Sequence, residues 1–90
     1  MLIRFAKKFV KQYDKAGIKI QSAFDNKLKL FSQNQFHPQL NNHSLTGKLT
    51  GYRSINITGD WRALYSSSQN EDGVIVVTFE TLGTHSQLYM

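Results

Sequence analysis

The sequence of 90 residues contains no cysteine, only one proline and no long uninterrupted apolar run. Without cysteine the chain can form neither a disulfide nor a thiolate zinc site, and it has no cysteine nucleophile. Charged residues interrupt the apolar N-terminal segment 1–13 every few positions, so we expect no signal peptide and no membrane span. We therefore predict a cytoplasmic protein in which residues 1–90 form one domain.

Basic residues are concentrated in the N-terminal third of the chain. Residues 1–30 hold eight Lys or Arg against two Asp, within a total net charge of +5. A basic surface of this kind can steer an anionic partner such as nucleic acid. A solvated, lysine-rich helix face would give the same pattern, so charge alone leaves both interpretations open.

The spacing of apolar residues predicts the fold. Segments 5–17 and 20–31 have apolar residues at helical spacing, which predicts a helical hairpin. The remaining segments are a candidate edge strand at 2–5, an extended connection at 32–51, a hairpin at 51–65, a solvated loop at 66–73 and a central strand at 74–82. This order favours an α+β fold in which the N-terminal helical hairpin packs on one face of a small antiparallel sheet of about four strands.

The hairpin segment GYRSINITGDWRALY is predicted to turn at Gly59-Asp60. A two-residue loop there would pair Asn56 with Ala63 and Ile55 with Leu64. A bulge or a longer loop would reverse the parity of one strand. With the two-residue loop, the face toward the helices carries Ile55, Ile57 and Leu64, and the face open to a ligand carries Ser54, Asn56, Trp61, Ala63 and Tyr65.

Polar and aromatic residues in and around this hairpin suit acid–base cleavage of RNA. Attack by a neighbouring 2′-hydroxyl needs a base, an acid and cations near the phosphate. Histidine is the natural proton carrier near pH 7, which makes His43 and His85 candidates. Two arginines, Arg53 and Arg62, can donate paired hydrogen bonds to phosphate oxygens, and the candidates for stacking on an unpaired base are Trp61, Tyr65 and Tyr89.

The same residues also have structural interpretations. The arginines can form cross-strand salt bridges with Asp60 or Glu80, and Trp61 can plug the core beside the turn. A zinc site made of two histidines and Asp60 would lack the HxxxH or HxH spacing that makes such a motif specific. We therefore expect no metal and no other cofactor.

Three motifs together resemble the RelE/ParE superfamily of bacterial toxins, in particular its YafQ-like mRNA interferase branch. They are HSLTGKLTGYR at 43–53, GDWRALY at 59–65 and GTHSQLY at 83–89. The resemblance covers nearly the whole chain, and the GDWR turn combined with the GTHxxLY end is more specific than either motif alone.

The resemblance implies a toxin of a type II toxin–antitoxin system that cuts translated mRNA at the ribosome without a metal. A cognate antitoxin would neutralise it in a hetero-oligomeric complex. His85 would transfer a proton, with Asp60 or His43 as its counterpart, and Arg62 matches an arginine of RelE-like members. The expected catalytic residues are His43, Asp60, His85 and Arg62, and the expected substrate-binding residues are Arg53, Asn56, Trp61 and Tyr89.

Two positions depart from the YafQ-like pattern. Asn56 stands where that branch has a further histidine, and Thr81 stands where it has an arginine. Asn56 can hold a phosphate or a base edge but cannot move a proton. One alternative is therefore a catalytically weakened member that retains only antitoxin binding. Another is a non-enzymatic, ParE-like poison of DNA gyrase, although His43 and His85 occurring with Asp60 favour the nuclease.

Overall fold

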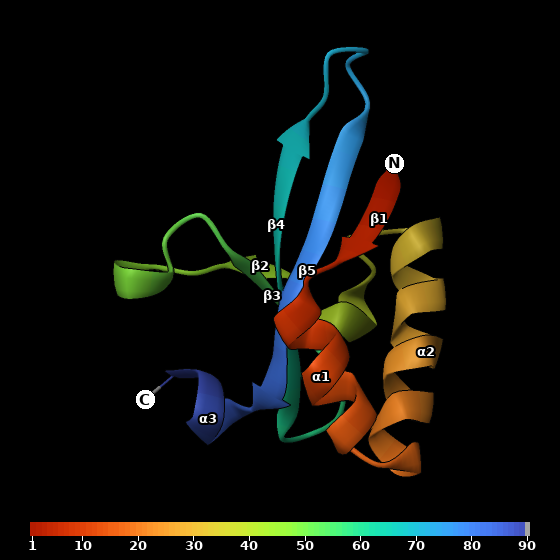
Figure 1. Ribbon diagram of the computed structural model, residues 1–90, viewed down its shortest axis with the longest axis vertical. Helices are drawn as coiled ribbons and strands as arrows, with labels where there is room; N and C mark the ends of the chain where they lie inside the picture. The colour runs from red at the N-terminus through yellow and green to blue at the C-terminus, as the bar shows by residue number, and fades with distance from the viewer. Residues whose placement is uncertain (90) are drawn as a thin grey trace.

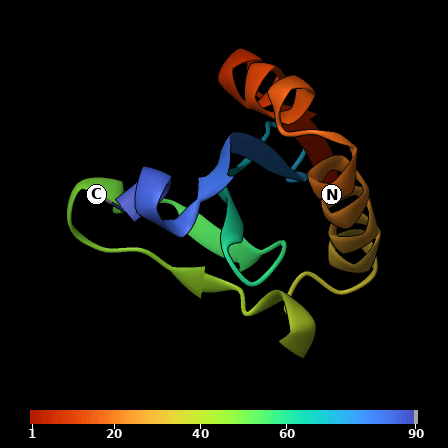
Figure 2. The same cartoon turned by 90° about the horizontal axis from the view of Figure 1, so that it is seen from below.

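The structure, a computed structural model, describes residues 1–89 as a five-stranded sheet with two long helices against it (Figures 1 and 2). The helices are α1 (Lys7–Lys15), α2 (Ile18–Gln33) and α3 (His85–Tyr89), with short 3-10 turns η1 (Pro38–Leu40) and η2 (Gly47–Leu49). The strands are β1 (Leu2–Phe5), β2 (His43–Ser44), β3 (Arg53–Asn56), β4 (Trp61–Gln69) and β5 (Ile75–Thr84).

The strands lie in the order β1-β5-β4-β3-β2, which confirms the α+β fold and the inner position of β5. The sheet is not wholly antiparallel, because β1 pairs in parallel with β5 from Leu2↔Val76 to Phe5↔Phe79. It also has one strand more than expected. The extra strand β2 is only two residues long and lies in the segment expected as an extended connection, so no period of two could reveal it.

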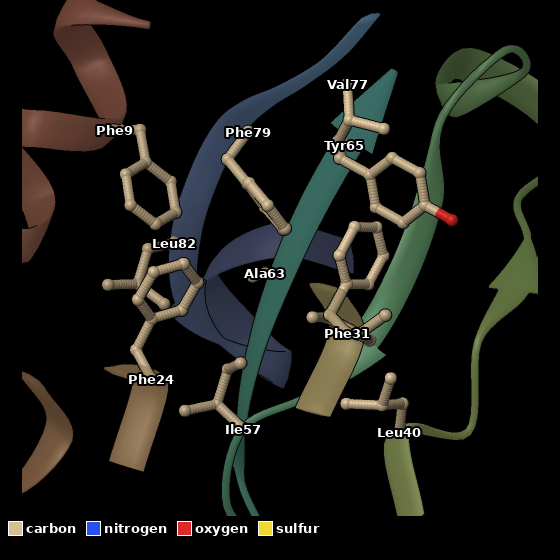
Figure 3. Close-up of a cluster of buried hydrophobic side chains, with 11 residues drawn as sticks. Phe9, Phe24, Phe31, Leu40, Ile57, Ala63, Tyr65, Val77, Phe79 and Leu82 are labelled. Carbon is tan, nitrogen blue, oxygen red and sulfur yellow. The ribbon is translucent and has the colours of Figure 1, made fainter. Parts of the chain in front are cut away.

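Aromatic side chains from the helices and the sheet form the core (Figure 3). Phe9 of α1 and Phe24 of α2 have ring centroids 5.0 Å apart, and Phe24 meets Phe79 of β5 edge-on at 5.4 Å. Phe31 packs edge-on against Tyr65 of β4 at 5.1 Å. All five rings are buried, so this aromatic layer fixes the helical hairpin on one face of the sheet.

A polar contact also joins the two long helices. The Tyr13 hydroxyl donates a hydrogen bond of 2.8 Å to the carboxylate of Asp25. This bond, with a smaller effect of burial, raises the pKa of Tyr13.

The hairpin between β3 and β4 has a different register from the one expected. The Ile57 N–H donates to the Trp61 carbonyl at 2.9 Å, which leaves Thr58, Gly59 and Asp60 in the loop. Thr58 Oγ1 accepts a hydrogen bond of 3.1 Å from the Trp61 N–H and so stabilises this longer loop. The expected two-residue loop was therefore wrong by one residue.

One residue of register reverses the faces of β4. Ile55 lies opposite Ala63 and Asn56 lies opposite Arg62. The helix-facing core therefore contains Ile55, Ile57, Trp61, Ala63 and Tyr65. Leu64, expected in that core, lies opposite Ser54 on the other face.

Two further segments differ from expectation. Residues 66–69, expected as loop, continue β4 and pair with β5 as far as Gln69↔Ile75. The C-terminal motif forms α3, a helix that was not expected. Within residues 1–89, the helices are all too short or too polar to cross a membrane.

Candidate active site

The outer face of the sheet, opposite α2, carries the candidate site. Figures 1 and 2 show α3 on the side of β3 and β4 that lies away from α2. Because side chains alternate along a strand, this face presents Ser54 and Asn56 from β3, and Arg62 and Leu64 from β4. His43 lies opposite Ser54 across the β2–β3 pair and shares the same face.

Gly83 allows α3 to lie directly on β5. A Cβ atom on Gly83 would lie 2.9 Å from Gln87 Oε1 and 3.2 Å from Leu88 Cδ2. Both distances are shorter than ordinary van der Waals contacts. The glycine of the GTH motif is therefore explained by close helix–sheet packing, since Gly83 is buried and its φ is not in the left-handed region.

Tyr89 fastens the other end of α3 to the middle of the sheet. Its hydroxyl donates a hydrogen bond of 2.7 Å to Oγ of Ser54, which has 0% of its surface exposed. One helical turn earlier, the His85 ring meets the Tyr89 ring edge-on, with centroids 4.7 Å apart. Through Tyr89, the imidazole of His85 is held relative to β3.

A backbone contact brings His85 to the hairpin loop. The His85 N–H donates a hydrogen bond of 2.8 Å to the carbonyl of Asp60. The side chains of both residues are exposed and can reach a ligand. The GDWR and GTH motifs therefore meet in space, although they are far apart in the chain.

His43 is also exposed, and a hydrogen bond orients its ring. Its Nδ1 lies 2.8 Å from the carbonyl oxygen of Asn41. A carbonyl can only accept, so Nδ1 carries the proton of the neutral ring and Nε2 keeps a free lone pair. This arrangement suits a proton acceptor.

Arg62 stabilises the loop that carries Asp60. Its Nη1 donates to the carbonyl oxygens of Thr58 and Trp61 at 2.9 and 3.0 Å, and its Nη2 donates to that of Gly59 at 3.3 Å. The guanidinium thus fixes the loop conformation while keeping Nε–H and one Nη2 proton for a ligand.

Asn56 is the one described residue with a buried side-chain oxygen or nitrogen that has no hydrogen-bond partner. The unpaired atom is Oδ1, on the face shared with Arg62. An unpaired buried acceptor costs about 1–3 kcal/mol. Because this oxygen is buried, a ligand can donate to it only after the Asn56 side chain turns outward.

Residues 2–90 match the YafQ toxin family, described as the bacterial toxin of a type II toxin–antitoxin system. The chain belongs to the YafQ toxin family. This confirms the resemblance inferred from the three motifs, and it makes the protein a toxin of a type II toxin–antitoxin system. No curated protein sequence matches the chain.

Solved structures of related toxins share the fold of this YafQ-family toxin. YafQ from E. coli strain BL21(DE3) is 21% identical, with a TM-score of 0.79 over 98% of this chain and 97% of that chain. The YoeB/ParE toxin from Agrobacterium tumefaciens is 16% identical, with a TM-score of 0.76 over 94% and 99%. The E. coli DinJ–YafQ complex matches at 22% identity and a TM-score of 0.72, over 98% and 97%.

Two of the sequence-predicted site residues of this YafQ-family toxin lie away from the outer face. Arg53 Nε donates to Asn42 Oδ1 at 2.8 Å, and its guanidinium lies 5.4 Å from the centre of the Phe36 ring. Trp61 packs against the core on the helix side. The other six predicted residues, His43, Asn56, Asp60, Arg62, His85 and Tyr89, come from the outer face, the adjacent hairpin loop and α3.

Sequence reasoning placed Ser54 on the ligand face but missed its role, and it also missed the role of Asn42. Ser54 anchors Tyr89, and Asn42 holds Arg53 while donating to the Tyr65 hydroxyl at 2.7 Å. The four-residue spacing of His85 and Tyr89 was a usable signal for α3, because it places both side chains on one helix face. Among residues 1–89, no cluster of three or more His, Cys, Asp or Glu side chains could hold a metal ion.

Proposed function

We propose that this YafQ-family toxin is an endoribonuclease that cuts translated mRNA at the ribosome, by attack of a 2′-hydroxyl on the neighbouring phosphate and without a metal. The observation that carries the proposal is the 2.8 Å bond from the His85 N–H to the Asp60 carbonyl. It joins the loop that carries the exposed Asp60 to the helix that carries the exposed His85, next to the sheet face that presents Arg62 and Asn56.

Proton transfer is divided between two histidines in this proposal. His43 accepts the proton of the 2′-hydroxyl at Nε2, because its Nδ1 faces the Asn41 carbonyl. His85 acts on the leaving 5′-oxygen, and the Tyr89 ring orients its imidazole. Asp60, on the hairpin loop, is joined to His85 by the backbone bond between the His85 N–H and the Asp60 carbonyl, and its carboxylate is the second candidate for a proton-transfer role.

The other residues of the outer face bind the phosphate, the ribose and the base. Arg62 has N–H groups that are not bonded to the loop carbonyls, and these can donate hydrogen bonds to the phosphate. Its positive charge lies beside the reacting phosphate. Asn56 lies opposite Arg62 on the same face, where its amide can contact the ribose or a base edge once the side chain turns outward. The proposed site omits Arg53, because Asn42 and Phe36 hold it on the other side of the sheet.

The proposed partners are an antitoxin, as expected for this toxin family, and the ribosome, as expected from the basic N-terminal helices. A cognate antitoxin binds the toxin, as DinJ binds YafQ in the E. coli DinJ–YafQ complex. In this proposal the antitoxin neutralises the toxin by covering the outer face. The ribosome presents the mRNA, which places the reaction in the cytoplasm. The basic N-terminal helices assist docking on ribosomal RNA through charge attraction.

Primer extension on a defined mRNA in a purified translation system tests the proposal. Cuts at codon positions that require ribosomes and disappear in His85→Ala would support it. A parallel sample contains the same mRNA without ribosomes and with EDTA. It tests whether cleavage needs the ribosome or a metal ion. Cutting of free RNA would keep the nuclease and remove the ribosome requirement. Growth arrest without any cut would exclude RNA cleavage and point to a gyrase poison.

A further inference from the structure

The C-terminal half of β5 has an open edge beside α1. Pairing with β1 ends at Phe79, whereas β5 continues to Thr84. A hollow of about 500 Å³ lies along this open edge and is lined by residues of α1, β4, β5 and α3 and by Leu49 of η2. Figure 1 shows α1 and α3 on either side of the same half of β5. We call this hollow the edge groove.

Two glutamines cover the open edge of β5. Gln12 Oε1 of α1 accepts the Leu82 N–H at 2.8 Å, and Gln87 Oε1 of α3 accepts the Thr84 N–H, also at 2.8 Å. These bonds satisfy backbone donors that an open strand would leave unpaired. They also orient both amides, and each glutamine keeps the two N–H donors of its NH₂ group and the second lone pair of its Oε1.

The groove is positively charged. Lys8 and Lys15 line it from one face of α1, about 10 Å apart along the helix axis. No Asp or Glu is present among the described residues that line it. Two ammonium groups with no carboxylate in the lining favour an anionic ligand.

An aromatic surface completes the groove. Trp61 lines it, and Thr81 contributes a short side chain that keeps it open. Trp61 follows Asp60 directly and pairs with Thr84, the residue before His85. One end of the groove therefore lies next in the chain to the loop and helix that carry Asp60 and His85, and its size is that of a small-ligand pocket.

We propose that the edge groove binds a nucleotide that flanks the cleaved bond in single-stranded RNA. Lys8 and Lys15 contact its phosphates, the two glutamine amides donate to oxygen acceptors, and Trp61 stacks on the base. The inference rests on the proposed function, because it assigns the path of the same RNA substrate. It also gives Trp61 a role that does not require it to lie on the outer face.

A matched pair of charge reversals on α1 tests the proposal. Lys8→Glu with Lys15→Glu changes the groove, and Lys7→Glu with Lys11→Glu makes the same change in charge on exposed positions outside the groove lining. The probe is a short fluorescein-labelled RNA with 2′-O-methyl riboses, which has no free 2′-hydroxyl to attack. Fluorescence anisotropy gives its Kd over a salt series.

We expect the groove pair to weaken binding roughly tenfold more than the control pair at low salt, because it removes direct phosphate contacts. We also expect it to reduce the slope of log K against log salt by about 1.4, which corresponds to two phosphates on single-stranded RNA. Equal effects of the two pairs would overturn the proposal, as would absence of RNA binding by the wild-type toxin.

A second pair of variants places side chains of the same shape but different charge at position 81. Thr81→Glu and Thr81→Gln both extend a side chain into the groove, and only Glu adds a negative charge. Weaker RNA binding by Thr81→Glu than by Thr81→Gln is expected, whereas equal binding would contradict an anionic ligand. If the groove variants bind RNA normally but lose a coexpressed cognate antitoxin, the groove binds an acidic protein segment and the RNA assignment is wrong.

Cleavage is scored separately in the translation system. Wild-type cutting together with equal RNA binding by both lysine pairs would reject the groove and leave the proposed function intact. Groove-dependent RNA binding by a protein that never cuts mRNA would reject the nuclease and leave the RNA site.

Discussion

The hydroxyl of Tyr89 donates a hydrogen bond of 2.7 Å to Oγ of Ser54, a residue 35 positions earlier in the chain. Ser54 is fully buried, so the bond forms where water does not compete. The Tyr89 ring also lies 4.7 Å from the His85 ring. The orientation of a proposed catalytic histidine therefore depends on a contact between the last helix and the middle of the sheet.

Tyr89→Phe should destabilise the toxin by about 1 kcal/mol, because the buried Ser54 hydroxyl loses its donor. Urea unfolding followed by the fluorescence of Trp61, the only tryptophan, measures the change. Ser54→Ala combined with Tyr89→Phe should cost less than the sum of the single changes, since it leaves no unpaired group. Fully additive effects would show that the hydrogen bond does not couple the two residues.

His85→Ala should reduce mRNA cleavage at least 100-fold and abolish growth inhibition, because it removes a proton-transfer group. The fold should persist, as His85 is exposed. Primer extension measures cleavage, and circular dichroism with antitoxin binding provides the control. A folded variant that still arrests growth would remove His85 from the mechanism.

Gly83→Ala should force the side chains of Gln87 and Leu88 on α3 to move, because the added Cβ would lie 2.9 Å from Gln87 Oε1 and 3.2 Å from Leu88 Cδ2. We expect a loss of about 1–3 kcal/mol in the free energy of unfolding, typical of overpacking. Gly59→Ala is the matched control for stability, since a Cβ there meets nothing within 4 Å. Equal unfolding midpoints for the two variants would contradict close packing of α3 on β5.

Arg62→Lys should keep the positive charge and lose the forked contacts with the carbonyls of Thr58, Gly59 and Trp61. We expect a cost of roughly 1.5 kcal/mol and weaker cleavage, because the loop that carries Asp60 is no longer held. Amide hydrogen exchange in residues 57–61 measures the loosening. Unchanged exchange with reduced cleavage would mean that Arg62 acts on the substrate alone.

The sequence predicted the elements whose pattern is local. Helical spacing located α1 and α2, because each helix has to bury one apolar stripe. The apolar segment 74–82 identified β5 as an inner strand, which it is, between β1 and β4. The motifs around His43, Asp60 and His85 indicated the toxin family, which the match over residues 2–90 confirms.

The local sequence pattern could not determine the register of the hairpin between β3 and β4. Whether Thr58 belongs to the strand or to the loop is decided by its bond to the Trp61 N–H and by the contacts of Arg62. That one residue moved Trp61 to the helix side, because strand parity changes with every step.

By itself, the sequence determined the helical hairpin, the central strand and the residue types able to move a proton, since these follow from spacing and side-chain chemistry. Only the tertiary structure decided the parallel pairing of β1, the register of β4, the bond from Tyr89 to Ser54 and the edge groove. Each of these joins segments far apart in the chain. Such contacts depend on how the whole core packs, which no local period encodes.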